Sequence, residues 1–503
     1  MVNSKKPLLG RFITKFISDV TPQYPSANTL SPKPQRTLSK LTQVRLGLKG
    51  QVAIFLKAAF LKDAFLELAL SQEASSKNLL VAFSGGLDST ALLHLLASLR
   101  ADLAFTLSAM HVHHGLSANA NAWVDFCTQA CSQLNIPLQV VHVTIPADNA
   151  LGIEAAARHL RYDALLGSHA DYVCLAHHQD DQAETLLLQL ARGAGIKGLS
   201  AMAAVDHKRH LLRPLLDISR AELEAYALAN GLTWIEDESN QNVAFDRNFL
   251  RHTILPKLHE RYPSIAKTLS RSASHMAEAT NLLGELAVID AQVYVHDKKL
   301  NIDALHNLST SRARNLLRWW LASLHQSMPN ILMPSTEQLA QILSQLAYAK
   351  TDAQIEIVLA GHAQQITTVR RYKNEAYLIT QPKQKPNDAN ILWQGEAELA
   401  LPDNSRLIFS EKLGAGLALK RLEVGKLRVS YRQGGESFKP DANRPTRTLK
   451  HLLQETNMPP WQREWLPLIY ADGKLALVPS LGVDASMQAN ADEIGWVVEW
   501  MQT

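Results

Sequence analysis

The sequence has few cysteines and no long apolar run. Only three of its 503 residues are cysteine, Cys127, Cys131 and Cys174, and no two of them form a C-x-x-C pair. An odd number without such a pair is not typical of a disulfide framework, so we expect buried thiols in a reducing, cytoplasmic compartment. No stretch approaches the roughly 20 consecutive apolar residues that a transmembrane helix needs. The sequence therefore predicts a protein that does not enter a membrane.

Acidic residues are almost absent before residue 61. Residues 1–60 contain ten of the 51 Lys and Arg residues but only one of the 47 Asp and Glu residues, Asp19. Together with a centre rich in Ser, Pro and Gln, this composition predicts a basic, disordered extension over residues 1–75. Three roles stay open for it: an arm that touches RNA, an extension without a selected role, and an organelle transit peptide.

Short apolar runs alternate with helical patterns from residue 79 onward, which is typical of parallel βαβ units. Strands are predicted at 79–83, 105–112, 138–145, 172–176 and 211–216, and helices at 89–100, 119–135 and 153–169. We therefore predict an α/β domain with a doubly wound parallel sheet over residues 76–250. Such sheets bind ligands at the carboxyl ends of their strands.

The pattern becomes mainly helical after residue 250, with no strand alternating with the helices. Helices are predicted at 311–324 and 336–347, a β-rich stretch at 354–380, a linker near 382–390 and a further helix at about 449–456. We therefore predict a mainly helical domain over residues 251–382 that ends in the β-rich stretch. A C-terminal α+β domain follows over residues 391–503.

A glycine-rich loop follows the first predicted strand and opens the first helix. It has the sequence Ser84-Gly-Gly-Leu-Asp-Ser-Thr90. Consecutive glycines let backbone N–H groups converge on an anion, and the helix N-terminus adds partial positive charge, so the loop predicts a phosphate site. The alternative is a tight strand-to-helix turn, which requires neither the double glycine nor Asp88. Residues 193–198 match G-x-G-x-x-G but follow a helix, so we expect no dinucleotide site there.

The loop lacks the lysine of common nucleotide hydrolases, whose G-x-x-x-x-G-K-[ST] pattern occurs nowhere in the chain. Its S-G-G-x-D-S pattern instead resembles the signature of the ATP pyrophosphatase, or PP-loop, family. That family cuts ATP between the α- and β-phosphates, so the resemblance implies adenylation, with pyrophosphate as the leaving group. It implies ATP and Mg²⁺ as cofactors, with Asp88 and Asp180 as candidate metal ligands because Mg²⁺ prefers oxygen. The candidate nucleotide-binding residues are Ser84, Gly85, Gly86, Leu87, Asp88, Ser89, His111 and His113.

Further blocks resemble one group of PP-loop enzymes, the tRNA(Ile)-lysidine synthases of the long form, which have a C-terminal tRNA-binding domain. The blocks are HVHHGL (111–116), GIEAAARHLRY (152–162), HQDDQAET (178–185), RG (192–193), RPLL (213–216), WIEDESN (234–240) and DRNFLR (246–251). The resemblance runs from about residue 79 to the C-terminus and does not cover residues 1–60.

This resemblance implies an ATP-dependent ligase that joins L-lysine to C2 of the wobble cytidine of a CAU-anticodon tRNA(Ile). The cytosine O2 would attack the α-phosphate, and the lysine amine would then displace AMP from the adenylated tRNA. The modification would change the codon from AUG to AUA and the amino-acid identity from methionine to isoleucine. The expected partners are that tRNA and free lysine, and a homodimer is left open.

Three acidic residues begin a helix after a predicted strand: Asp180, Asp181 and Glu184. Asp180 and Glu184 lie four residues apart and share a helix face. We expect the three to hold Mg²⁺ or the amine of the incoming lysine, and the sequence does not separate the two roles. Helix capping is the alternative, because a helix dipole favours acids in its first turn. With Asp88 and Arg161 they make up the expected catalytic set.

Glu154, Arg158 and Arg161 share one face of the preceding predicted helix. The resemblance favours Arg161 on the ATP phosphates or the substrate. The alternative is a solvated face of ion pairs.

Five histidines, at 111, 113, 114, 177 and 178, also suggest a zinc site. The resemblance implies Mg²⁺ instead, and the first three end a strand where nucleotide contacts are expected.

A basic segment in the C-terminal domain predicts contact with RNA phosphates. Residues 420–450 contain nine Lys and Arg residues but three acids, and phosphate contacts supply affinity without base specificity. The residues that we expect to contact RNA are Arg192, Arg251, Arg432, Arg444, Arg447 and Lys450. A solvated basic surface is the alternative for the C-terminal four, and an ion pair at a helix start for Arg251. In the middle domain, Arg312, Arg314 and Arg318 beside Trp319 and Trp320 are either RNA contacts or, for the tryptophans, core residues.

Two other classes of protein stay as alternatives. A PP-loop sulfur transferase would need catalytic or cluster-binding cysteines, which the cysteine pattern disfavours. A non-enzymatic RNA-binding module would not need the loop, the acids and the arginines together. Release of AMP and pyrophosphate that depends on both tRNA and lysine separates the three.

Overall fold

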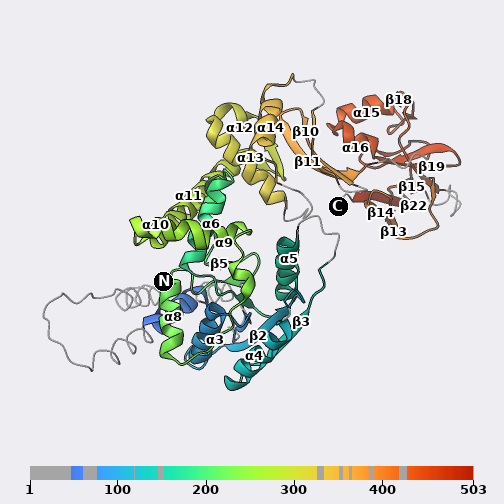
Figure 1. The fold of residues 1–503 in the computed structure, drawn as a ribbon. Coiled ribbons are helices and arrows are strands. Elements are labelled where there is room, and N and C mark those ends of the chain that lie inside the picture. The colour runs from blue at the N-terminus through green and yellow to red at the C-terminus, as the bar shows by residue number, and fades with distance from the viewer. Residues whose placement is uncertain are drawn as a thin grey trace, which may run out of the picture. The chain divides into compact units, whose positions relative to one another are not determined.

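The computed structural model describes residues 47–60, 76–117, 119–145, 152–325, 333–350, 355–361, 365–383, 390–418 and 427–501. The chain divides into two compact units, Met1–Thr280 and Asn281–Thr503 (Figure 1). Most of the predicted extension, residues 1–46 and 61–75, lies outside the described residues. None of the helices within the described ranges is both long and apolar enough to span a membrane. The boundaries of the three predicted domains stay a prediction.

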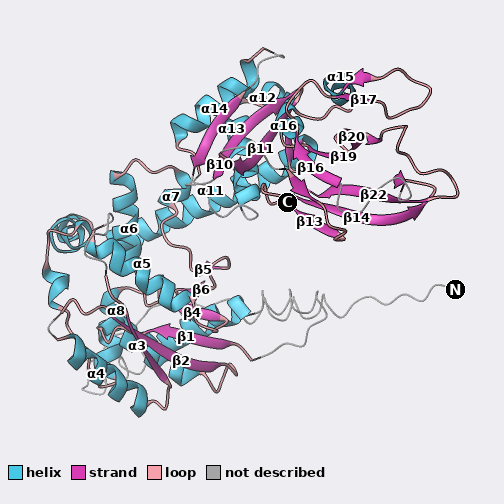
Figure 2. Cartoon of the chain, turned by 90° about the vertical axis from the view of Figure 1, so that its right-hand side faces the viewer, coloured by secondary structure: helices cyan, strands magenta, loops and turns pink. Residues whose placement is uncertain are grey.

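A six-stranded sheet forms the centre of the first unit, with strand order β3-β2-β1-β4-β6-β5 (Figure 2). All neighbours pair in parallel except β5, which is antiparallel to β6. The strands are β1 Asn78–Ala82, β2 Thr106–His113, β3 Leu138–His142, β4 Tyr172–Cys174, β5 Val205–Asp206 and β6 Leu211–Leu212. The longer helices between them are α3 Leu87–Leu99, α4 Ala120–Gln133, α5 Ile153–Leu166 and α6 Gln179–Ala191, and α8 Arg220–Ala229 follows β6. The predicted doubly wound α/β fold is confirmed.

Alternate residues of β1 enter different cores, because successive side chains of a strand point to opposite faces. Leu79 and Val81 pack with α3 and Cys127 of α4, whereas Leu80 packs with Leu165 of α5. Both faces of the sheet are therefore covered by helices, which leaves the carboxyl ends of the strands as the open edge.

Residues 47–60 form a helix that packs into the first of these cores. Leu48, Val52, Leu56 and Ala59 are buried there at helical spacing. The prediction of a disordered extension is therefore wrong for this stretch. The basic composition of the whole segment concealed a short apolar period, whose burial stabilises the helix.

The first unit ends in short helical segments. They are α7 Ile196–Leu199, a 3-10 turn Glu238–Gln241, α9 Asp246–Phe249, a π-helical turn Leu250–Ile254 and α10 Leu255–Arg261. The long helix α11, Ile265–Tyr294, follows.

The second unit contains a helical part packed on a five-stranded antiparallel sheet of order β7-β8-β11-β10-β9. Its elements are β7 Val295–His296, β8 Lys299–Asn301, α12 Asp303–Asn307, α13 Thr310–His325, α14 Thr336–Tyr348, β9 Glu356–Gly361, β10 Gln365–Tyr372 and β11 Glu375–Pro382. The expectation that no strand alternates with these helices is wrong, because β7 and β8 form a hairpin between α11 and α12. Strands of two and three residues are too short to show an alternating pattern.

The predicted core role of the tryptophans is confirmed for Trp320. Its ring is fully buried, and its Nε1 donates to the Lys298 carbonyl over 2.9 Å. Arg312 is engaged by the buried carboxylate of Asp290.

The C-terminal part consists of two antiparallel sheets, of order β12-β16-β19-β20-β21 and β13-β14-β22-β15, with a two-stranded β17-β18 ribbon. The strands are β12 Ile391–Leu392, β13 Glu398–Ala400, β14 Arg406–Leu413, β15 Leu417–Ala418, β16 Leu427–Tyr431, β17 Ser437–Phe438, β18 Arg447–Thr448, β19 Pro467–Ala471, β20 Lys474–Val478, β21 Gly482–Val483 and β22 Ile494–Met501. The helices are α15 Leu449–Glu455 and α16 Pro460–Glu464. This agrees with the predicted α+β character.

Candidate active site

The glycine-rich loop joins the end of β1 to the start of α3. Gly85 has a φ of +86°, and a Cβ at this position would lie 2.7 Å from Ile235 Cδ1. The Ile235 amide also donates to the Gly85 carbonyl over 2.9 Å, which holds Ile235 close to the loop. Because of this close approach and the positive φ, only glycine fits at position 85. The hydroxyls of Ser89 and Thr90 donate to the Gly86 and Gly85 carbonyls over 3.0 and 3.2 Å. The loop is thus held in a shape that leaves the first amides of α3 for an anion.

Two of the predicted nucleotide contacts, His111 and His113, lie on β2 beside this loop. His111 is buried, with its Nδ1 3.0 Å from the Phe83 carbonyl oxygen at the end of β1. Burial lowers the pKa of His111, so the imidazole is neutral. The His113 ring lies 4.6 Å from that of His142. A nucleotide contact by either histidine stays a prediction.

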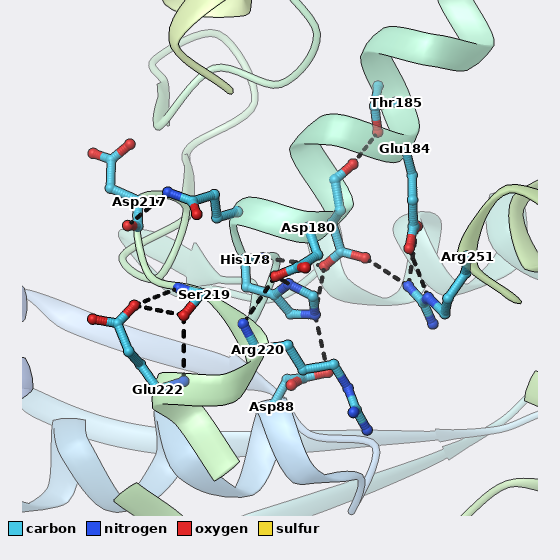
Figure 3. A network of polar contacts seen from close by, with 12 residues as sticks. Asp88, His178, Asp180, Glu184, Thr185, Asp217, Ser219, Arg220, Glu222 and Arg251 are labelled. Atoms are coloured by element: carbon cyan, nitrogen blue, oxygen red, sulfur yellow. Dashed lines mark hydrogen bonds and ion pairs between the residues drawn. The ribbon is translucent and has the colours of Figure 1, made fainter. Parts of the chain in front are cut away.

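His178, at the start of α6, lies between three carboxylates (Figure 3). Its Nε2 is 3.5 Å from Asp88 Oδ2 and 3.4 Å from Asp181 Oδ2, and its Nδ1 is 3.6 Å from Asp180 Oδ2. The His178 side chain is only 2% exposed. Burial opposes a charge on the ring, but the three carboxylates outweigh it and raise the pKa of His178 to about 10. A buried imidazolium therefore joins Asp88 of the phosphate loop to the acids of α6.

A second helix start fixes Asp180. The backbone amide of Arg220, the first residue of α8, donates to Asp180 Oδ2 over 2.9 Å. The N-terminus of α8 is capped by a capping box between Ser219 and Glu222. Burial would raise the pKa of Asp180, but its contacts with His178 and Arg220 lower it, so the group is a carboxylate.

Glu184 is held by two arginines from the segment that follows α8. Its carboxylate, 1% exposed, accepts from Arg247 Nε over 2.8 Å and from Arg251 Nε over 2.6 Å. Arg251 Nη2 also lies 3.0 Å from Asp181 Oδ1. The π-helical turn that carries Arg251 precedes Pro256, which has no N–H to bond the His252 carbonyl. The predicted alternative for Arg251, an ion pair, is therefore present, and an RNA contact stays a prediction.

Asp88 also offers a free ligand atom. Its Oδ1 is buried without a hydrogen-bond partner, whereas its Oδ2 contacts His178. Among the described residues, no three His, Cys, Asp or Glu side chains form a group that could hold a metal alone. A Mg²⁺ ion commonly takes one or two carboxylates and completes its shell with phosphates and water. The residues present therefore fit a Mg²⁺ bound jointly by Asp88 and a nucleotide.

Arginines of α5 and its surroundings bring several positive charges together. Burial and the neighbouring Arg158 and Arg247 lower the pKa of Arg161. Arg213, also buried, donates to the Ala203 carbonyl over 2.6 Å. Burial lowers the pKa of His177 to about 3, so this ring is neutral. Guanidiniums in such surroundings favour an anionic ligand. The predicted common face with Glu154 is not tested, because the side chain of Glu154 lies outside the described residues.

All three thiols are buried. Burial raises the pKa of Cys127 and Cys174 to about 12 and that of Cys131 to about 11. Thiolate, the nucleophilic form of cysteine, is therefore scarce at neutral pH. These thiols do not suit a sulfur transferase.

Iodoacetamide at pH 8 is expected to leave Cys127, Cys131 and Cys174 unmodified in the folded protein, because the thiols are buried and protonated. Mass spectrometry before and after addition of denaturant measures the modification. The denatured protein should gain three adducts, and rapid alkylation of the folded protein would contradict the expectation.

Three arginines predicted to contact RNA are paired with carboxylates of the C-terminal domain. Arg432 Nε lies 3.4 Å from Glu436, and Arg444 Nε lies 3.5 Å from Asp441. Arg447 Nη1 donates to Glu455 over 3.1 Å. In the first unit, Arg192 lies 3.9 Å from Asp246. The pairs of Arg192 and Arg444 are exposed and therefore weak, so these two arginines can exchange partners. The Arg432–Glu436 pair is largely buried.

The GxGxxG match at residues 193–198 follows α6 and runs into α7, so it has no preceding strand. The prediction that it is no dinucleotide site agrees with this placement.

Two residues of this site lie outside the predicted catalytic set. His178 is predicted only as a possible zinc ligand, although the H-Q-D-D order places a ring beside two carboxylates at a helix start. Arg247 is not among the predicted site residues, although its spacing of four from Arg251 indicates two guanidiniums on one helix face.

The parallel sheet, the phosphate loop without lysine and the acids at the carboxyl ends of the strands define a PP-loop ATP-using enzyme domain. A family model described as the PP-loop domain matches residues 61–258. Models described as the TilS substrate binding domain and the TilS substrate C-terminal domain match residues 300–377 and 427–500.

Named relatives cover most of the chain. The tRNA(Ile)-lysidine synthase of Nitrosomonas europaea is 39% identical over 87% of this chain and 95% of the relative. The enzyme of the same name from Coxiella burnetii is 41% identical over 84% of this chain and 93% of the relative. That from Serratia proteamaculans is 41% identical over 85% and 97%. The chain belongs to the tRNA(Ile)-lysidine synthase family.

Proposed function

We propose that this protein is a cytoplasmic ligase that forms lysidine on tRNA(Ile). It joins L-lysine to C2 of the wobble cytidine of the CAU anticodon and converts ATP to AMP and pyrophosphate. One observation supports this most strongly. In a chain of this family, His178 brings Asp88 of the phosphate loop and the acids of α6 into a single site.

Two displacement reactions use this site. In the first, a bond forms between the cytosine O2 and the α-phosphorus, the bond from that phosphorus to the bridging oxygen breaks, and pyrophosphate leaves. In the second, a bond forms between the lysine nitrogen and C2, the C2–O2 bond breaks, and AMP leaves with O2. Lysine attacks as the neutral amine, and the proton that its nitrogen loses as the bond forms passes to a carboxylate of α6 or to water. The amides at the start of α3 hold phosphate oxygens, and Arg161 neutralises charge on the leaving groups.

A Mg²⁺ ion held by Asp88, with Asp180 as the second candidate ligand, would neutralise phosphate charge when bound. The carboxylates of Asp180, Asp181 and Glu184 face the same site and favour a cationic amine nearby. Asp181 and Glu184 are already paired with Arg251. We therefore assign amine binding chiefly to Asp180, whose partners are His178 and a backbone amide.

The C-terminal domain binds the tRNA at a region away from its anticodon. Arg432, Arg444, Arg447 and Lys450 supply positive charge for phosphates, with Arg192 and Arg251 as further contacts in the catalytic unit. Deleting residues 385–503 is therefore expected to weaken tRNA binding at physiological salt. A homodimer is also compatible with this function, and light scattering measures it.

The direct test is incubation of the protein with ATP, radiolabelled lysine and a transcript of CAU-anticodon tRNA(Ile). Label should enter that tRNA and not the elongator methionine tRNA, which has the same anticodon. AMP and pyrophosphate should appear together with the label. ATP cleavage without incorporation of lysine would contradict the proposal.

A further inference from the structure

An exposed aromatic surface lies on the segment that also positions Glu184. Phe245 and Phe249 are 37% and 44% exposed, and Val243 is 51% exposed. Single exposed apolar residues are common on proteins, but two phenylalanines and a valine within seven residues form a patch that favours a partner. We define Val243, Phe245 and Phe249 as the α9 patch.

The α9 patch is rigidly supported. Asn248, buried beneath it, donates through Nδ2 to the Asn242 carbonyl over 3.0 Å, and the Ala244 amide donates to Asn242 Oδ1 over 3.0 Å. The Phe249 amide donates to the Phe245 carbonyl over 2.9 Å. Phe245 and Phe249 are four residues apart, so their side chains are neighbours on one side of the turn.

The same short segment reaches the reaction site. Arg247 lies two residues from each phenylalanine, which places it about half a turn round the helix. Its guanidinium binds Glu184 over 2.8 Å and the Thr185 hydroxyl over 3.0 Å. A helix with its side chains is about 10–12 Å across, so the rings lie about that distance or slightly more from the α6 acids, on the other side of the turn. A nucleotide next to one held at these acids can therefore reach the patch.

Exposed basic side chains lie near the α9 patch, together with the carboxylate of Asp246. Arg192 lies 3.9 Å from Asp246, between the two phenylalanines in sequence, and its side chain is largely exposed. Lys257 is exposed on the following helix, α10. Aromatic rings beside cations are the combination that binds single-stranded nucleic acid, since bases stack on the rings while cations attract the backbone.

We propose that Phe245 and Phe249 stack on an unpaired anticodon-loop base next to the cytidine that is modified. This inference rests on the proposed function, because it takes the RNA substrate from it. Stacking on the neighbour would hold the loop open while the target cytidine enters the site. Phe245 and Phe249 are then binding residues for the loop and take no part in either displacement.

The test compares lysine incorporation by the wild type with that by Phe245→Ala, Phe249→Ala and the double variant. The KM for tRNA should rise about 10-fold or more for the double variant, while the KM for ATP stays within about 2-fold. Phe249→Tyr should behave like the wild type, whereas Phe249→Leu, apolar but not aromatic, should behave like the alanine variant. Tyr262→Ala is the matched control, since Tyr262 is an exposed aromatic residue after α10 and should have no effect.

A second measurement identifies the base. Full-length tRNA(Ile) is prepared with an abasic nucleotide on either side of the wobble position. One of the two should raise the KM of the wild type but add little to that of the double variant. Equal KM values for the wild type and the double variant would overturn the proposal, as would a changed oligomeric state of the double variant with unchanged tRNA kinetics. Failure of the wild type to incorporate lysine would instead remove the proposed function.

Discussion

Replacing Glu184 with Gln is expected to lower the rate of lysine transfer about 100-fold, the scale observed when one preorganised polar group is removed from an active site. The Glu184 carboxylate is buried and neutralises the guanidiniums of Arg247 and Arg251. Glutamine keeps the shape but loses the charge, so both arginines lose their anchor and Arg251 no longer holds Asp181. Adenylation, measured as tRNA-dependent pyrophosphate release without lysine, should fall less, because Glu184 has no direct contact with the phosphate loop.

The same variant should also be less stable. Removing one partner of a buried ion pair costs about 3–5 kcal/mol, and the partly exposed arginines place Glu184→Gln toward the lower end. Urea denaturation measures this loss. The double variant Glu184→Gln/Arg251→Gln should recover part of the stability, because it leaves one uncompensated guanidinium instead of two, but none of the lysine transfer.

The exposed Glu224 of α8 supplies the matched control, and Glu224→Gln should resemble the wild type in both measurements. Lysine transfer at the wild-type rate by Glu184→Gln would remove Glu184 from the expected catalytic set. Recovery of transfer in the double variant would show that Glu184 acts only by neutralising Arg251.

The sequence predicted those parts of the fold and the site that depend only on residues close together in the chain. The phosphate loop and the acidic start of α6 each lie within one turn of a helix, so residue order alone places them. The partners of those acids come from elsewhere in the chain. Arg251 is 67 residues from Glu184, and Asp88 is 90 residues from His178. Only the packing of α3, α6 and the π-helical turn creates these contacts.

The remaining errors have a common physical origin in short segments. The helix at residues 47–60 buries four apolar side chains, although it belongs to a basic segment. Strands β7 and β8 are two and three residues long. Tertiary packing stabilises such elements even when composition or period predicts something else. The ion pairs of Arg432, Arg444 and Arg447 could not be predicted either. Arg432 and Arg444 have partners four and three residues away but lie outside helices, and Arg447 of β18 reaches Glu455 of α15.

Replacing His178 with Gln is expected to slow both adenylation and lysine transfer, each about 10-fold to 100-fold. This is the scale observed when a residue that orients a metal ligand is changed. The imidazolium lies within 3.6 Å of Asp88, Asp180 and Asp181. A neutral glutamine amide leaves the three carboxylates to repel one another. Asp88 then moves relative to the ATP phosphates, and Asp180 moves relative to the lysine amine. Pyrophosphate release and label incorporation measure the two steps separately.

The exposed His169, after α5, provides the control, since His169→Gln should have wild-type rates. Loss of lysine transfer alone would contradict the role of His178 in joining the two halves of the site. The pair of variants then separates the steps. Glu184→Gln acts mainly on transfer, whereas His178→Gln acts on both, because of these two side chains it is His178 that contacts the phosphate-loop carboxylate.

Stability should reveal the charge of His178 independently of activity. Its pKa is raised from about 6.5 in the unfolded chain to about 10 in the folded protein. A group whose pKa is higher in the folded state stabilises the protein fully below the unfolded value and loses this contribution as the pH rises through the folded value. The difference in unfolding free energy between the wild type and His178→Gln should therefore be largest near pH 6 and shrink toward pH 10. A difference that grows with pH would mean that His178 is neutral, and the carboxylates would then need another counterion.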